Sequence, residues 1–181
     1  MKIFKFGGAS VKDAEGVKNV LHVLNTVGHE DVLLVISAMG KTTNALEVVI
    51  KNYFDKSKEL HASLQEVRKY HNQILLDLFE DEDHDVFFDI NAHFDDLEYF
   101  IRSNKSPNYS FVYDQVVSIG ELVSTTIVSH YFNYSGLKNN WIDVRPLIKT
   151  DNNYRDAQVD WETTQKLISK GVKKKTLNIT Q

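Results

Sequence analysis

Three short segments carry residues whose types and spacing could do chemistry, and the first of them is Lys5–Gly8. The β-branched and aromatic run Ile3–Phe6 opens directly onto two glycines, which predicts a strand that ends in a tight turn. Glycines at such a turn let backbone N–H groups approach a phosphate closely, and the ammonium group of Lys5 could neutralise charge on the same oxygens. The alternative is an ordinary strand-to-helix turn beside a surface lysine.

The second segment is Ser37–Asn44, with the sequence Ser-Ala-Met-Gly-Lys-Thr-Thr-Asn. Its Gly40–Thr42 part matches the end of a phosphate-binding P-loop, but Val35 stands where that motif requires its first glycine, so we reject the P-loop. What remains is a loop rich in hydroxyl groups after a strand, which is where ligands bind in open α/β sheets. Its hydroxyl groups, those of Ser37 and Thr43 among them, could hold a small polar substrate or simply cap the next helix.

The third segment, Ser118–Glu121, lies inside an otherwise apolar helical pattern. A glycine in a helix costs about 1 kcal/mol relative to alanine. A carboxylate flanked by Ile119 and Leu122 is expensive to bury without a partner. Glu121 either points to solvent or, together with the close-approach glycine, grips an ammonium group.

Composition excludes several classes of function. The chain has 181 residues, of which 42% are hydrophobic and 25% charged, enough for one sizeable core or one large lobe of a bigger domain. A formal net charge of −4 gives no basic excess for nucleic acid or an anionic membrane. The absence of cysteine excludes disulfides, thiolate metal sites and a cysteine nucleophile, and it suits a reducing cytoplasm.

The N-terminal residues contain no apolar run of the kind that a signal peptide has, and the longest such run in the chain is Val32–Ile36. We therefore expect a cytoplasmic protein without a membrane span. The seven histidines show no metal-ligand spacing, and the acidic stretch Asp77–Asp89 is typical of a solvated helix turn. No metal site is expected within the chain.

The elements that must position these segments follow from the hydrophobic pattern. Ser10 with Asp13 resembles a capping box, and apolar residues then recur at helical spacing up to Gly28, which suits a C-terminal glycine cap. The continuous apolar run Asp31–Ile36 predicts a strand buried on both faces of a parallel sheet. Asn44, with Glu47 three residues later, looks like the next helix start, and this βαβα opening predicts a layered α/β fold.

The middle of the chain is helical in pattern. One apolar stripe runs from Leu46 to Leu78 and a second from Val86 to Ile101, and this pair predicts a helical hairpin beside the sheet. A third helix carries apolar residues from Val112 to Tyr131. Strands are expected at Trp141–Ile142 and Thr176–Ile179, separated by a segment that begins with an irregular polar stretch.

Four motifs in order resemble those of one family, the aspartate kinases. Their positions are Lys5–Val11 (with Ala9 where threonine is usual), Ser37–Asn44, Ser118–Glu121, and Asp143–Arg145 followed by Thr150–Asp151 and Ala157. Any one of them alone would be weak, but together they span nearly the whole chain.

The resemblance implies the amino-acid-kinase fold, a mainly parallel sheet sandwiched by helices, here with a helical hairpin insertion. It implies transfer of the γ-phosphoryl group of ATP to the β-carboxylate of L-aspartate, with Mg²⁺, at the start of lysine, threonine and methionine synthesis. It also implies a homo-oligomer in the full-length protein.

The resemblance assigns roles by position. Lys5 would be catalytic and stabilise the phosphoryl group in transfer, and the cofactor phosphates would be lined by Lys5, Phe6, Gly7 and Gly8. L-Aspartate would be held by Ser37, Thr43 and Glu121, the last through the α-amino group of the substrate. Ala9 lacks the hydroxyl group that the family usually has near the phosphates.

In this family a glycine-rich segment and a Gly-Arg-Gly-Gly-Ser-Asp motif follow a strand like that of Thr176–Gln181. We therefore expect residues 1–181 to be the N-terminal substrate lobe, cut off before the nucleotide lobe and the regulatory domains, and inactive alone. Two alternatives remain: another amino-acid kinase of the same fold with a different acid acceptor, and a non-catalytic binding or assembly module.

Overall fold

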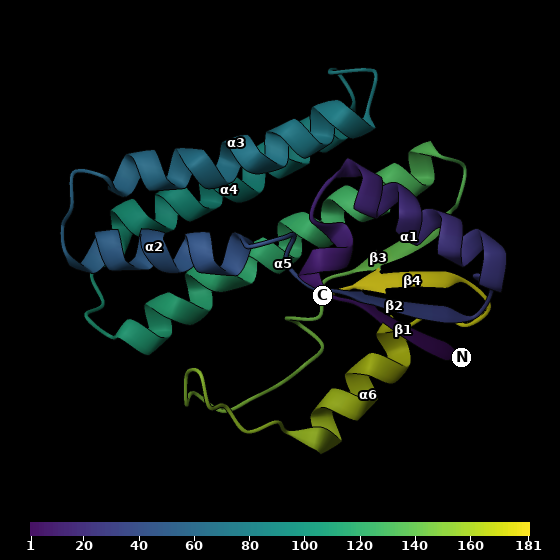
Figure 1. The fold of residues 1–181 in the computed structure, drawn as a ribbon. Helices are drawn as coiled ribbons and strands as arrows, with labels where there is room; N and C mark the ends of the chain where they lie inside the picture. The colour runs from purple at the N-terminus through teal and green to yellow at the C-terminus, as the bar shows by residue number, and fades with distance from the viewer.

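A parallel sheet of four short strands organises the chain (Figure 1). The computed structural model describes all residues from Met1 to Gln181. The strands are β1 (Lys2–Phe6), β2 (Val32–Ile36), β3 (Asn139–Ile142) and β4 (Leu177–Thr180), in the order β1-β2-β4-β3. Every neighbouring pair is parallel, so the carboxyl ends of all four strands lie at one edge of the sheet.

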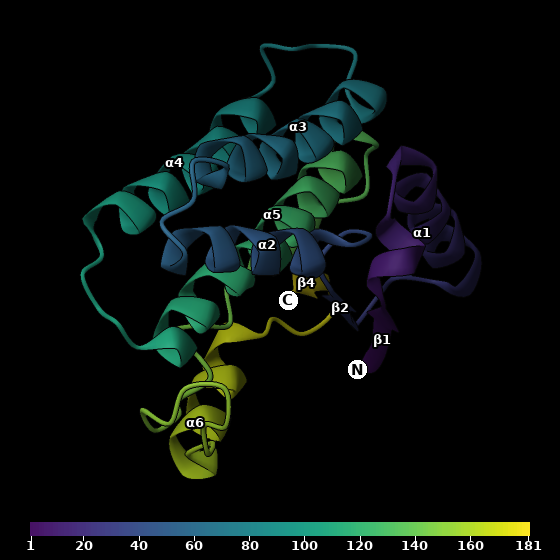
Figure 2. The same ribbon diagram turned by 60° about the vertical axis from the view of Figure 1, so that its left-hand side comes forward.

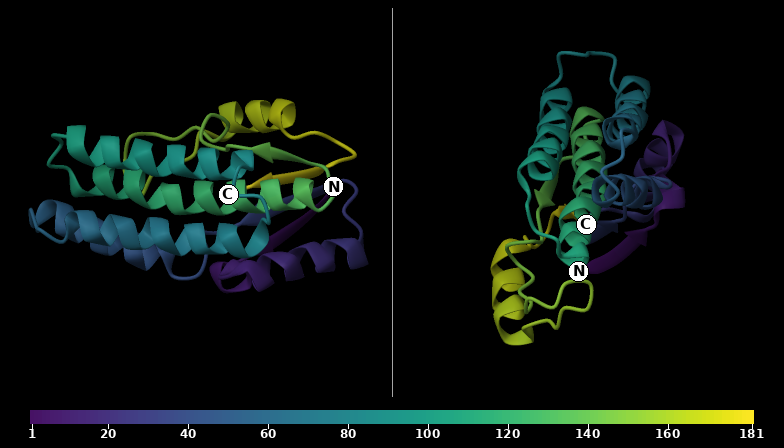
Figure 3. Two further views of the ribbon diagram at one scale, coloured as in Figure 1. Left: turned by 90° about the horizontal axis from the view of Figure 1, so that it is seen from above. Right: turned by 90° about the vertical axis from the view of Figure 1, so that its left-hand side faces the viewer.

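Six α-helices and one short 3₁₀ turn complete the fold. They are η1 (Gly8–Val11), α1 (Ala14–Val27), α2 (Thr42–Phe54), α3 (Leu60–Leu78), α4 (Asp85–Ser103), α5 (Tyr109–Tyr134) and α6 (Trp161–Gly171). Helices α1 and α5 cover one face of the sheet, with α2, α3 and α4 in further contact with α5, whereas α6 lies on the opposite side (Figures 1 and 3). The expected α/β fold with a parallel sheet between helices is confirmed.

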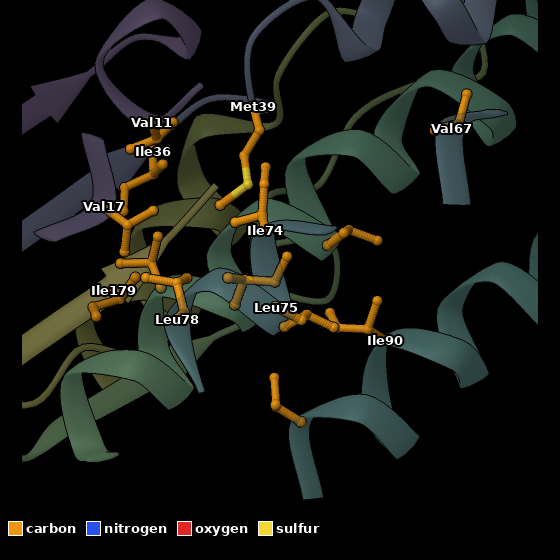
Figure 4. Packing of buried hydrophobic residues seen from close by; sticks show 14 of the residues in the cluster. Val11, Val17, Ile36, Met39, Val67, Ile74, Leu75, Leu78, Ile90 and Ile179 are labelled. Carbon is orange, nitrogen blue, oxygen red and sulfur yellow. The ribbon is translucent and has the colours of Figure 1, made fainter. Parts of the chain in front are cut away.

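The core lies between the sheet and the layer formed by α1, α3 and α5. Ile36 and Ile179 from neighbouring strands meet Val17 from α1 and Leu78 from α3 there (Figure 4). Burial alternates along β2, whose first, third and fifth residues are fully buried and whose other two are half-buried. The expected burial of this strand on both faces therefore holds fully for one face, because α6 alone lies on the other side of the sheet.

Two helix starts differ from the expected ones. Ser10 lies inside the 3₁₀ turn, and Asp13 is the N-cap of α1, where its carboxylate accepts the Gly16 N–H at 2.8 Å. Helix α2 begins at Thr42 rather than Asn44, because the Thr42 hydroxyl donates to the Met39 carbonyl at 2.6 Å and closes the loop two residues earlier.

The predicted helical hairpin is present, but its first stripe is divided between α2 and α3, which residues 55–59 separate. Helices α3 and α4 lie side by side (Figure 2). Arg68 of α3 pairs with Asp95 of α4 at 2.6 Å. Helix α6 was not predicted and falls in the segment between the last two strands. None of the helices combines the length and the apolar character that crossing a membrane requires.

Candidate active site

The carboxyl edge of the sheet brings the first two chemical segments together. The Gly7–Gly8 turn follows β1 and Ser37 follows β2, and these strands are hydrogen-bonded neighbours. The Ser37 N–H donates to the Phe6 carbonyl at 3.1 Å, so the pairing of the strands continues into the loops. This edge is the expected ligand position in an open α/β sheet.

The two loops interlock through their glycines. The Gly40 N–H donates to the Gly8 carbonyl at 3.0 Å, and Gly40 has a φ of +54°, which favours glycine. A Cβ atom on Gly8 would lie 2.5 Å from the Ala38 carbonyl oxygen. Gly8 therefore lacks a side chain because another loop packs against it.

Gly7 has a different environment. The nearest atom to a Cβ built on Gly7 is the Lys5 Nζ, at 4.0 Å. Gly7 thus faces open space beside an ammonium group, which is the arrangement that a phosphate requires. Of the two glycines, Gly7 has the geometry for close approach of a ligand.

This contrast gives a prediction for alanine at each position. Gly8→Ala should lower the free energy of unfolding by about 2 kcal/mol, because its Cβ meets backbone atoms that cannot move freely. Gly7→Ala, the matched control, has an extended backbone and free space and should cost well under half of that. Urea unfolding of both variants measures the difference, and equal losses would contradict the packing described for Gly8.

Helix α5 brings the third segment to the same loop. A Cβ on Gly120 would lie 3.1 Å from the Ala38 Cβ and 3.1 Å from the Thr42 Cγ2, so the helix approaches the loop closely at this point. One turn later the Ser124 hydroxyl donates to the Ser37 carbonyl at 2.8 Å. The glycine that is costly in an isolated helix is explained by this contact.

Glu121 is half-buried beside the loop. Burial raises the pKa of its carboxyl group, and hydrogen bonding from backbone N–H groups, that of Ala38 among them, acts in the opposite direction. Glu121 forms no salt bridge within the chain. A partly desolvated carboxylate without a cationic partner is suited to bind an ammonium group.

The remaining expected residues lie at different distances from this centre. Thr43 is half-buried in the first turn of α2, next to Thr42, which touches Gly120. The Phe6 side chain packs against the hydrophobic core, so its contribution at the site is the carbonyl that holds Ser37. The Ser118 hydroxyl donates to the Gln115 carbonyl of its own helix at 3.2 Å.

The fourth motif flanks the same edge at β3. Arg145 makes a two-pronged contact with Asp143, at 3.0 Å through Nε and 2.7 Å through Nη2, and this lowers the pKa of the carboxylate against the effect of its burial. Thr150 and Asp151 are exposed in the following loop, and their side chains form hydrogen bonds within it.

Sequence reasoning missed Ser124 and the backbone N–H of Ala38. Ser124 lies four residues after Gly120, hence on the same face of the helix, and this spacing was the available signal. Ala38 acts through its backbone N–H, which every residue except proline has, so the residue type at this position could not have predicted that contact.

The chain contains no group of three or more His, Asp or Glu side chains that could hold a metal ion. Its residues therefore form no protein cage for Mg²⁺. In kinase sites this ion commonly keeps several waters and binds through substrate phosphates with one or two carboxylates.

Comparison with known proteins identifies the family. The family model described as the amino acid kinase family matches residues 1–174. The chain belongs to the amino acid kinase family. The interlocked loops at the carboxyl edge are thus part of an amino acid kinase domain.

The curated relatives of this amino acid kinase are aspartokinases, which confirms the resemblance found in the motifs. Bifunctional aspartokinase/homoserine dehydrogenase 2 of Escherichia coli is 29% identical over 150 residues, which cover 83% of this chain and 18% of that protein. The chloroplastic aspartokinase 1 of Arabidopsis thaliana is 30% identical over 142 residues, 75% of this chain and 24% of that protein. The chain thus spans about a fifth of the length of these relatives.

A solved structure supports the fold. Aspartokinase III of E. coli, in complex with lysine and aspartate, matches the whole chain with a TM-score of 0.84 and 22% identity. The matched part is 40% of that protein. The same enzyme has also been solved with aspartate and ADP, with a TM-score of 0.83.

Proposed function

We propose that the chain provides the aspartate-binding and phosphate-facing part of an aspartate kinase. In the proposed reaction, a β-carboxylate oxygen of L-aspartate attacks the γ-phosphorus of ATP, the bond from that phosphorus to the β,γ-bridging oxygen breaks, and ADP leaves. The product is an acyl phosphate.

The observation that carries this proposal is the position of Glu121. Its half-buried carboxylate lies beside the Ser37–Ala38 backbone and has no cationic partner in the chain. An α-amino group would supply that partner, and the hydroxyl groups of Ser37 and Thr43 could hold a carboxylate of the same ligand. The aspartate found with E. coli aspartokinase III supports this choice of substrate.

The phosphate end of the proposal rests on Lys5 and Gly7. Lys5 is exposed at the end of β1 beside the open side of Gly7. An ammonium group there would stabilise the negative charge on the phosphoryl oxygens during transfer. Mg²⁺ would arrive bound to the ATP phosphates, where it would neutralise charge. None of the roles proposed for residues of this chain requires a protein side chain to bind the metal ion.

The proposal predicts that Glu121→Gln weakens the binding of L-aspartate by about 2 kcal/mol, or roughly 30-fold, because a charge-assisted hydrogen bond to the ammonium group is lost. Succinate has both carboxylates but no amino group. It should bind the unchanged protein weakly and lose little further affinity in the variant. Isothermal titration calorimetry of both ligands with both proteins measures these four affinities.

Two outcomes would count against the proposal. An equal loss of succinate and aspartate affinity would mean that Glu121 supports the fold rather than the amino group. Binding of neither L-aspartate nor MgATP by the whole protein would favour a non-catalytic assembly module.

A further inference from the structure

We propose that Tyr70 and His71, adjacent residues of α3, position the two loops of the site. We treat them as positioning residues, since the contacts described below are to the loops themselves. The inference deepens the proposed function, because the loops in question are those assigned to phosphate and aspartate.

His71 is attached to the second loop by a buried hydrogen bond. Its side chain is fully buried, and its Nε2 lies 3.2 Å from the hydroxyl of Thr42, which is 3% exposed. The other ring nitrogen, Nδ1, lies 2.8 Å from the Val67 carbonyl oxygen, which can only accept. We therefore assign the proton to Nδ1, so that Nε2 of the neutral ring accepts from Thr42.

The Thr42 hydroxyl is shared between two acceptors. It lies 2.6 Å from the Met39 carbonyl, inside the loop, and 3.2 Å from His71, on the helical hairpin. The same hydroxyl thus joins the loop to α3. The Tyr70 and Phe94 rings pack against the imidazole, with centroids 5.0 Å and 5.7 Å away, and fix its orientation.

Tyr70 reaches both loops from the preceding position. Its hydroxyl donates to the Lys12 carbonyl, in the turn between the glycines and α1. A Cβ on Gly40 would lie 2.5 Å from the same hydroxyl oxygen, so Gly40 leaves room for this tyrosine. One residue therefore holds the end of the first loop and packs against the second.

These contacts link the two loops and α3 to one another. Tyr70 contacts Lys12 and Gly40, Gly40 donates to Gly8, and Thr42 links back to His71. Both loops are thereby fixed to one rigid helix that carries none of the assigned substrate contacts. Catalytic groups need supporting contacts of this kind, because misplacement by about 1 Å can reduce the rate a hundredfold.

The test uses amide hydrogen exchange of the whole chain, measured without ligand. The informative amides are Gly40 N–H and Thr42 N–H, which donate to Gly8 and Met39. His71→Leu and Tyr70→Phe should each speed exchange at these two amides by about tenfold, because each change removes one hydrogen bond that holds a loop. Amides in α4 should change little.

Matched controls are available for both changes. Tyr113→Phe removes a hydroxyl group that donates to Glu47 at 2.8 Å, and His93→Leu removes a ring whose Nε2 lies 3.3 Å from the Thr126 hydroxyl. These controls remove the same kinds of bond without contacting either loop, so Gly40 and Thr42 should exchange at the original rate in both.

If His71→Leu folds poorly, Thr42→Val tests the same hydrogen bond between Thr42 and His71 from its other partner. It removes the hydroxyl group with little change in volume and should also speed exchange at Gly40. In the double variant with His71→Leu, the loss of exchange protection at the Gly40 amide should be smaller than the sum of the losses in the two single variants. The reason is that both changes remove the same hydrogen bond.

Exchange that is unchanged at Gly40 and Thr42, or that rises equally throughout the chain, would overturn the positioning role. The aspartate affinity of the same variants is a separate measurement, and we expect it to fall several-fold. If the unaltered protein binds no aspartate, the proposed function fails while the exchange result still decides the role of Tyr70 and His71.

Discussion

Lys5→Ala should lower kcat for ATP-dependent phosphorylation of L-aspartate by about 100-fold or more, equivalent to about 3 kcal/mol, with little change in KM for aspartate. The Lys5 ammonium group has no ion-pair partner in the chain and lies next to the open side of Gly7. Its charge acts on the phosphoryl group as that group moves, so its loss is felt in the transition state. Steady-state kinetics of the whole aspartate kinase that we propose gives both constants.

Lys2→Ala is the matched control. Lys2 is an exposed lysine of the same strand, at the end opposite to the site, and its loss should leave kcat within about twofold of the original. If Lys5→Ala keeps its kcat and instead loses aspartate affinity, then Lys5 is a substrate ligand and its assignment to the phosphoryl group is wrong.

The second large effect concerns acid stability. Burial lowers the pKa of His71 from 6.5 to about 4, against the hydrogen bond to Val67, which favours the protonated ring. The unfolded chain therefore binds the proton more tightly than the folded chain. The stability contributed by neutral His71 is fully present above pH 6.5 and is lost as the pH falls towards about 4. The amount lost is on the order of 3 kcal/mol.

The measurement is urea unfolding of the original protein and of His71→Leu at several pH values between 7.5 and 4. As the pH falls, the original protein should lose about 3 kcal/mol more of its free energy of unfolding than His71→Leu does, since leucine has no proton to bind. His93 and His130, whose pKa values burial also lowers, contribute equally to both proteins. Parallel curves would mean that folding leaves the pKa of His71 unchanged, and the expected loss of stability in acid would then be wrong.

The sequence was sufficient for the layers and for placing the first two chemical segments at the ends of strands. The apolar runs of β1 and β2 and the glycines that follow them are local signals, and local signals predict strands and turns well. The three-residue spacing of Asn44 and Glu47 was misleading, because the hydroxyl of Thr42 found an acceptor within the loop and started α2 earlier.

Other features depend on partners distant in the sequence. His71 belongs to an apolar helical stripe, and its partner Thr42 is 29 residues away, so no local pattern links them. Helix α6 has one buried residue, Thr164, and so lacks the wide apolar stripe that a prediction needs. Its available signal was the N-cap Asp160, whose carboxylate accepts the Thr163 N–H at 3.0 Å.

The strand order also affects how the chain folds during its synthesis. Strand β4 pairs with β2 on one side and with β3 on the other, although both are made before it. Until residues 177–180 leave the ribosome, β2 and β3 each keep an unpaired edge, and such edges can pair with other chains. These four strands can therefore join into one sheet only after β4, the last of them along the chain, has been made.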